Sequence, residues 1–160
     1  MAALPLVFPQ AMEFASNRPI SHGLMTPTSI PAAGVSSRMI AYITLGGILG
    51  TLARYFLQGT LQIRRGTFPT GTLAINIAGS FLLGFIIRFA TGSTVISPEL
   101  RGGLTIGFCG AFTTMSTFSY ESIRLLGDGE YWYAGLYAGG TVLGCLLATV
   151  AGLALAGKLL

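Results

Sequence analysis

The chain has 160 residues, of which 52% are hydrophobic and only 9% are charged, and its mean hydropathy is +0.72. A soluble domain carries about 25% charged residues, so this composition indicates an integral membrane protein, and the length suits one domain. The net charge of +4 does not indicate nucleic-acid binding, because the nine basic residues are scattered singly apart from the pair Arg64–Arg65. The two cysteines, Cys109 and Cys145, lie in apolar segments, which favours small packing residues over a disulfide or a metal site.

Residues 1–38 differ in composition from the rest of the chain. They contain five of the seven prolines, and no apolar run in them approaches the roughly 20 residues that a membrane-spanning helix needs. The proline spacing also prevents a continuous helix, so we interpret this region as a disordered cytoplasmic tail. A targeting extension is the alternative, because the region is poor in acidic residues.

Four long apolar segments follow the tail. They cover about residues 39–61, 69–90, 100–125 and 131–157. Each is long enough to cross a bilayer, so the sequence predicts an all-α membrane protein with four transmembrane helices in residues 39–160. Small residues recur at every fourth position from Gly140 to Ala156, which predicts close helix packing and suggests an oligomer interface as well.

The distribution of basic residues does not choose an orientation in the membrane. Lys and Arg near the segment ends number four on the side of the N-terminus and three on the other. The positive-inside rule needs a larger bias than this. The balance would allow the chain to insert both ways and pair head to tail.

The third segment contains the most polar stretch of the apolar region. Residues 107–121 read GFCGAFTTMSTFSYE, with five hydroxyl side chains in the seven residues from Thr113 to Ser119. Irregular backbone at membrane depth is tolerated only where it is buried in protein or lines a watery cavity. We therefore predict a helix broken in mid-membrane at an ion site. The alternative is a kinked helix whose Ser and Thr side chains bond back to their own turn.

Two polar side chains in the first two segments each allow two interpretations. Arg54 can attract anions at a pore vestibule, or it can snorkel or pair with backbone carbonyls. Thr72, Asn76 and Ser80 follow one another at intervals of four residues, so they share a helix face. The Asn76 amide can form an interhelical hydrogen bond or present a donor to an anion path.

Further candidates lie in the third and fourth segments. Tyr137 and Thr141 are four residues apart, and their hydroxyls can donate to an anion. Glu121 can accept from such hydroxyls and so orient their protons. The positive ring edge of Phe118 can face a small anion, although a Phe in a membrane bundle is usually packing.

Three blocks of the sequence resemble the signature blocks of the CrcB/Fluc fluoride channel family. These blocks are GGILGTLARY at 46–55, PTGTLAINIAGSFLLG at 69–84 and GFCGAFTTMSTFSYE at 107–121. The resemblance covers about residues 40–160. It implies a fluoride-specific channel in the cell (inner) membrane, assembled as an antiparallel, dual-topology homodimer in contact with membrane lipid. It also implies a structural sodium ion at the dimer centre.

The resemblance further assigns roles to individual residues. The sodium ligands are the backbone carbonyls of Gly110 and Thr113, and the signature arginine is Arg54. Two phenylalanines of the third helix present ring edges to fluoride in this family; the second is Phe118, and the first falls on Met115. The fluoride pathway then comprises Asn76, Met115, Ser116, Thr117, Phe118, Glu121, Tyr137 and Thr141. A further position that often carries a hydroxyl is Cys145.

Two other functions remain as alternatives. A proton-coupled exporter of the small multidrug-resistance type also has four spans, but it uses a carboxylate in its first span, where this chain has Arg54 and no acid. A membrane scaffold without transport would use the polar stripes for packing alone. An enzyme is not expected, since no nucleophile–base pair or metal-ligand cluster is evident.

Overall fold

The computed structural model describes residues 36–63, 66–92 and 95–160, all within one compact unit, Val35–Leu160. The predicted N-terminal tail, residues 1–38, lies almost entirely outside the described residues and stays a prediction. The basic pair Arg64–Arg65 lies outside them as well.

Three helices of this unit are long and apolar enough to cross a membrane. They are α1 (Ser37–Leu61), α2 (Thr70–Gly92) and α6 (Tyr131–Lys158). Their ends differ by at most two residues from the first, second and fourth predicted spans. The predicted all-α architecture is therefore confirmed for these three spans.

The third span is assembled from several short pieces. It begins with α3 (Pro98–Gly102), continues as a π-helical segment (Gly103–Cys109) and α4 (Gly110–Phe112), and resumes after a break as α5 (Met115–Gly127). At the break the backbone is extended, with φ −81° and ψ 159° at Thr113 and φ −149° and ψ 111° at Thr114. The predicted interruption in mid-span is confirmed, and it falls at the two threonines.

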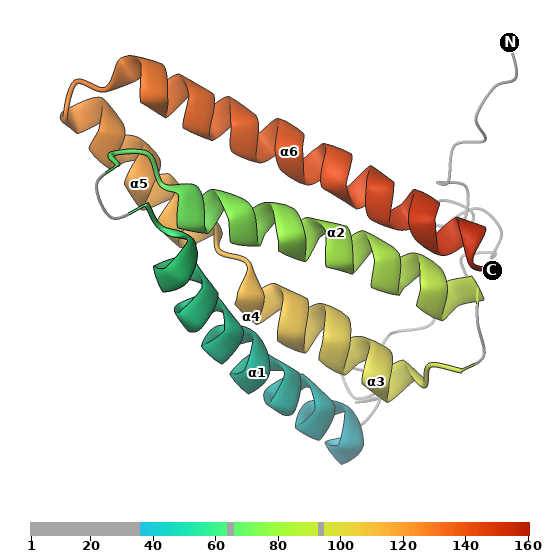
Figure 1. Ribbon diagram of the computed structural model, residues 1–160. Helices are drawn as coiled ribbons and strands as arrows, with labels where there is room; N and C mark the ends of the chain where they lie inside the picture. Colours follow the sequence, from blue (N-terminus) through green and yellow to red (C-terminus); the bar gives the residue numbers. More distant parts are fainter. Residues whose placement is uncertain (1–35, 64–65, 93–94) are drawn as a thin grey trace, which may run out of the picture. The chain divides into compact units, whose positions relative to one another are not determined.

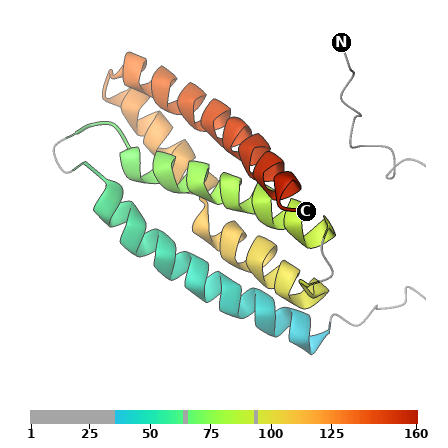
Figure 2. The same ribbon diagram turned by 45° about the vertical axis from the view of Figure 1, so that its right-hand side comes forward.

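The helices are arranged with α2 in the centre. Figures 1 and 2 both show α2 between α6 on one side and α1 with the broken helix on the other. α2 packs mainly against α6, whereas α1 packs mainly against the π-helical segment. Glycines make these approaches possible: a Cβ at Gly50 would overlap the Phe108 carbonyl, and one at Gly152 would overlap the Phe81 carbonyl. Part of the predicted small-residue ridge therefore packs within the chain, although Gly140 meets nothing within 4 Å.

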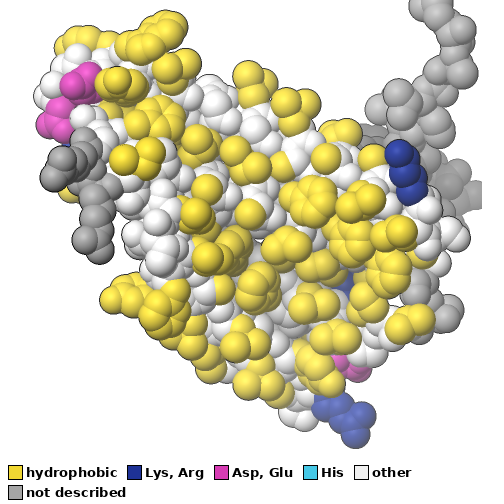
Figure 3. Space-filling model, in the orientation of Figure 1, with side chains coloured by type: hydrophobic (Ala, Val, Ile, Leu, Met, Phe, Trp, Pro, Cys, Tyr) yellow, Lys and Arg dark blue, Asp and Glu magenta, His cyan; other side chains and the backbone are white. Residues whose placement is uncertain are grey.

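The outer surface of the described bundle is apolar along its length. In Figure 3 hydrophobic side chains cover most of the visible face, and charged side chains gather mainly towards its ends. The buried core is small and lies where α5 meets α6, around Phe118, Leu125, Ala134 and Tyr137. A surface of this kind suits contact with lipid or with another apolar protein surface, as expected of a membrane bundle.

Candidate functional site

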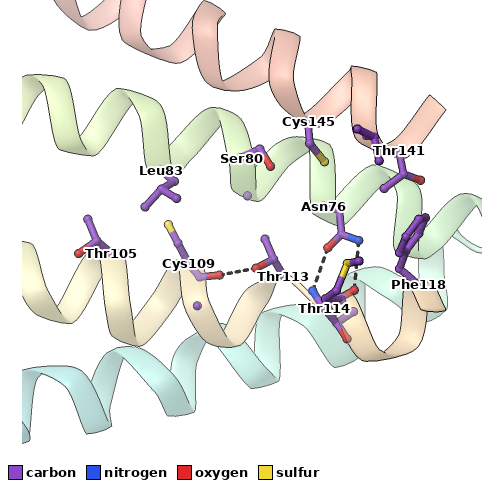
Figure 4. Close-up of a pocket in the computed structure, with 14 residues that line it drawn as sticks. Asn76, Ser80, Leu83, Thr105, Cys109, Thr113, Thr114, Phe118, Thr141 and Cys145 are labelled. Carbon is purple, nitrogen blue, oxygen red and sulfur yellow. Dashed lines mark hydrogen bonds between the residues drawn. The ribbon is translucent and has the colours of Figure 1, made fainter. Parts of the chain in front are cut away.

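A cavity of about 330 Å³ lies beside the break in the third span. It is bounded by α2, the π-helical segment, the first turn of α5 and α6, and Figure 4 shows these walls with their side chains. Polar and sulfur-bearing residues on its walls include Asn76, Ser80, Cys109, Thr113, Met115, Thr141 and Cys145. Phe118 closes the same wall near Thr141 (Figure 4).

Asn76 binds the broken backbone with both ends of its amide. Its Oδ1 accepts from the Thr114 N–H at 2.8 Å, and its Nδ2 donates to the Thr114 carbonyl at 3.3 Å (Figure 4). Asn76 is 7% exposed, so these bonds form away from solvent. The interhelical hydrogen bond, one of the two alternatives for this residue, is thus present. Nδ2 carries a second hydrogen, so the amide can still donate to a ligand in the cavity.

This amide contact explains how the break persists. In a continuous helix the Thr114 N–H would donate to the Gly110 carbonyl four residues earlier. Because it donates to Asn76 instead, the Gly110 carbonyl loses its helical partner. The next helix starts at the same point, where the Thr114 hydroxyl accepts from the Thr117 N–H at 3.2 Å as an N-cap.

Arg54 reaches the break from α1. Its guanidinium donates to the Thr113 carbonyl at 3.5 Å, which is long for a hydrogen bond. Pairing with a backbone carbonyl was one of the alternatives for this residue, and the structure places it there. Arg54 is not among the residues that line the cavity.

A second polar cluster surrounds the carboxylate of Glu121. The Tyr137 hydroxyl donates to Oε2 at 2.6 Å, and the Thr72 hydroxyl donates to Oε1 at 3.1 Å. Gln58 Nε2 donates in turn to the Thr72 oxygen at 3.0 Å, which directs the Thr72 proton towards the carboxylate. Glu121 therefore accepts from hydroxyls on two other helices, the geometry expected for a group that orients their protons.

The two clusters meet at Phe118. This side chain is 8% exposed, and its ring lies 5.2 Å from the ring of Tyr137, centroid to centroid. One helical turn further along α6, Thr141 is 5% exposed, and its hydroxyl has no hydrogen-bond partner among the described residues. An unpaired buried hydroxyl on a cavity wall is unusual, because buried polar groups normally have partners.

The remaining predicted residues differ in whether they line the cavity and in how deeply they are buried. Ser116 and Thr117 do not line the cavity; their hydroxyls bond to Thr114 Oγ1 at 3.2 and 3.0 Å. Met115 lines the cavity but is 70% exposed, whereas Phe118 is buried. The two positions of the expected aromatic pair thus differ sharply in burial within one chain.

Three contributing residues were not among the predicted site residues. Thr114 forms the cap and the contact with Asn76, while Thr72 and Gln58 complete the Glu121 cluster. A sequence signal existed for all three, and Thr114 lies in the hydroxyl-rich stretch at which a helix break was predicted. Thr72 precedes Asn76 by one turn, and Gln58 follows Arg54 by one turn, so each shares a helix face with a predicted residue.

A helical bundle with an apolar outer surface, a broken third span and a polar cavity at the break defines a multi-pass membrane protein built around that cavity. The comparison with known families then makes the assignment specific. The family described as "CrcB-like protein, Camphor Resistance (CrcB)" matches residues 41–153. The chain belongs to this family, as the three sequence blocks indicated.

Individual relatives agree with this membership, and each is named fluoride-specific ion channel FluC. The protein of Geotalea daltonii is 50% identical over 118 residues, which is 73% of this chain and 95% of the relative. That of Geobacter sulfurreducens is 49% identical over 121 residues, 75% of this chain and 98% of the relative. That of Chlorobium phaeobacteroides is 46% identical over 111 residues, 69% of this chain and 87% of the relative. The family is thus one of channels and not of enzymes.

Proposed function

We propose that this protein is a fluoride-specific channel that lowers cytoplasmic fluoride by passive efflux. The observation that carries the proposal is the cavity at the helix break, where the buried Thr141 hydroxyl has no partner within the described part of the chain. Such a hydroxyl can donate to an anion. The relatives named as fluoride channels support the same ion.

The cavity walls suit a small, strongly hydrated anion. The Thr141 hydroxyl, the second N–H of Asn76 and the positive ring edge of Phe118 can each replace a water of hydration. The described residues that line the cavity include no Lys or Arg, so no fixed positive charge would trap the ion. Conduction requires sites that bind the ion favourably yet weakly enough for the ion to leave. Chloride is larger and would be incompletely solvated by the same groups.

The fluoride path continues from this cavity towards Glu121. Tyr137 connects the two clusters, since its ring packs on Phe118 and its hydroxyl bonds to Glu121. The Ser116 and Thr117 hydroxyls lie at the start of α5, within the cap of that helix.

Hydrogen fluoride crosses membranes uncharged and releases fluoride inside a cell. A passive path would let the anion leave down its gradient.

A second copy of the chain completes the channel as an antiparallel homodimer. The break is exposed on the single chain: Gly110 and Ser116 are exposed, and Met115 is 70% exposed. Lipid cannot satisfy backbone groups released at such a break, so protein must cover them. The near balance of basic residues between the two ends is compatible with opposite insertion of the two copies.

A structural sodium ion at the dimer centre fits the same feature. The Gly110 carbonyl has lost its helical donor, and the Thr113 carbonyl lies outside regular helix and keeps a second lone pair beside its long contact with Arg54. Neutral carbonyl oxygens are ligands that hard cations accept. The ion would supply positive charge that holds the broken helices of both copies together.

Fluoride efflux from liposomes that contain the purified full-length chain tests the proposal, with chloride as the control ion. We expect fast fluoride loss without a proton gradient and with chloride retained.

Met115 should suffice in place of Phe, because its flexible, polarisable side chain fills similar space. Met115→Phe should then change the rate without removing selectivity. Proton-dependent flux would indicate an exporter, and no flux in either form of a well-folded dimer would indicate a scaffold.

A further inference from the structure

A second hollow lies at the end of the bundle where α1 ends and α2 begins. Its volume is about 320 Å³, and it is lined by Gln58, Gly59, Gln62, Pro69, Glu121 and Arg124. Glu121 and Arg124 are the charged members of this described lining; they stand three positions apart on α5 and so share a helix face. We call this hollow the terminal cleft.

We propose that the terminal cleft is an anion-binding mouth of the channel, and that Arg124 draws fluoride into it. This inference rests on the proposed function, because it supplies the aqueous end of the same path. Arg124 and Gln62 have no role in the fluoride pathway described above, and Gln58 enters it only through its bond to Thr72 in the Glu121 cluster.

The polar groups of the cleft are arranged as donors. Gln62 is held in place at both ends of its amide, since Nε2 donates to the Phe68 carbonyl at 3.2 Å and Oε1 accepts from the Gly71 N–H at 3.2 Å. Gln58 Nε2 donates to Thr72 at 3.0 Å. Each of these amide nitrogens carries a second hydrogen beyond the bond that it makes here. With the Arg124 guanidinium, the cleft therefore presents two neutral donors and one cationic donor to an incoming anion.

The carboxylate of Glu121 does not cancel this preference. Both of its oxygens already accept hydroxyl protons, from Thr72 on α2 and from Tyr137 on α6. Among the described lining residues, Glu121 and Arg124 carry one formal charge of each sign, so these two charges cancel. Binding there would be weak, as passage through a channel requires.

The cleft is also continuous in contacts with the main cavity. Gln58 bonds to Thr72, Thr72 bonds to Glu121, and Glu121 bonds to Tyr137. The Tyr137 ring packs on Phe118, which lines the main cavity. The Glu121 cluster therefore separates an anion held near Arg124 from the proposed fluoride site in the main cavity.

Charge removal at Arg124 tests the inference in the full-length chain reconstituted in liposomes. We expect Arg124→Gln to lower the initial fluoride efflux rate about threefold at low ionic strength, where the Debye length is roughly 30 Å at 0.01 M. The deficit should vanish near 1 M of an impermeant salt, where that length is about 3 Å. Arg101→Gln is the matched control, because it removes the same charge. Arg101 is exposed in the last turn of α3 and does not line the cleft.

A charge-swap experiment separates electrostatics from folding. Arg124→Cys, treated with a cationic methanethiosulfonate, should regain flux, and an anionic reagent of similar size should lower it further. The untreated and treated wild-type chain is the control, because Cys109 and Cys145 are natural thiols.

The outcomes distinguish this inference from the channel assignment. Normal wild-type efflux with an Arg124→Gln rate equal to that of Arg101→Gln at every salt concentration would overturn the cleft proposal alone. A deficit that is independent of salt, or equal effects of both reagents, would overturn it as well, since those results indicate a structural role. A wild-type chain that passes no fluoride would overturn both proposals.

Discussion

Replacement of Asn76 by alanine should affect both the fold and the ion path, in amounts that can be measured separately. The change removes two hydrogen bonds to Thr114, at 2.8 and 3.3 Å, and leaves a buried N–H and C=O without partners. Interhelical hydrogen bonds in membranes contribute about 0.6 to 1.7 kcal/mol each. An unpaired buried group costs about 1–3 kcal/mol. We therefore expect a loss of about 2 kcal/mol in the free energy of unfolding.

The functional loss should be larger than this destabilisation explains. Without the amide, the Thr114 N–H can regain a partner only by donating to the Gly110 carbonyl, and that change would straighten the helix and close the break. The cavity would also lose a donor. We expect fluoride efflux to fall at least about tenfold, which is equivalent to about 1.4 kcal/mol in the free energy of ion binding or of the transport barrier. Asn76→Asp should keep the bond from the Thr114 N–H, but it sets an acceptor against the Thr114 carbonyl and buries a negative charge, so it should be destabilised and equally inactive.

The assay is fluoride efflux from liposomes beside thermal unfolding in detergent, with Ser80→Ala as the matched control. Ser80 lies one turn from Asn76 on the same face and also lines the cavity. Its substitution should leave both readouts nearly unchanged. The reasoning would be refuted if Asn76→Ala kept wild-type efflux and wild-type unfolding, since the break would then not depend on the amide.

Three further substitutions follow from the same contacts. Thr141→Val replaces a buried hydroxyl, which has no partner among the described residues, by a methyl group of similar size. The unfolding temperature should rise or stay unchanged, while fluoride efflux should fall. Unchanged efflux would exclude this hydroxyl from the path. Tyr137→Phe removes the 2.6 Å bond to Glu121 and should cost about 1–2 kcal/mol in unfolding free energy, measured by denaturation in detergent; an unchanged midpoint would contradict it. Gly152→Ala should destabilise by about 1–3 kcal/mol because its Cβ overlaps the Phe81 carbonyl, whereas Gly139→Ala meets nothing within 4 Å and should be neutral in the same assay.

The sequence alone was sufficient for the membrane class, the four spans and the interruption of the third. These properties depend on hydropathy over long windows and on local residue chemistry. Span ends agreed within two residues because the loss of apolar character at a membrane boundary is abrupt. The sequence blocks also identified the family, which the match to residues 41–153 shows independently.

Only the tertiary structure decided which polar side chains meet. The spacing of Asn76 allowed either an interhelical bond or a donor facing an ion, and the position of Thr114 across the helix interface shows the bond. The separate burial of Met115 and Phe118 likewise depends on how α5 turns after the break. Gln58 on α1 and Arg124 on α5 are distant in sequence, and only the folded structure shows that they line one cleft. Such contacts depend on how helices dock, and local periodicity does not encode the partner that each face will find.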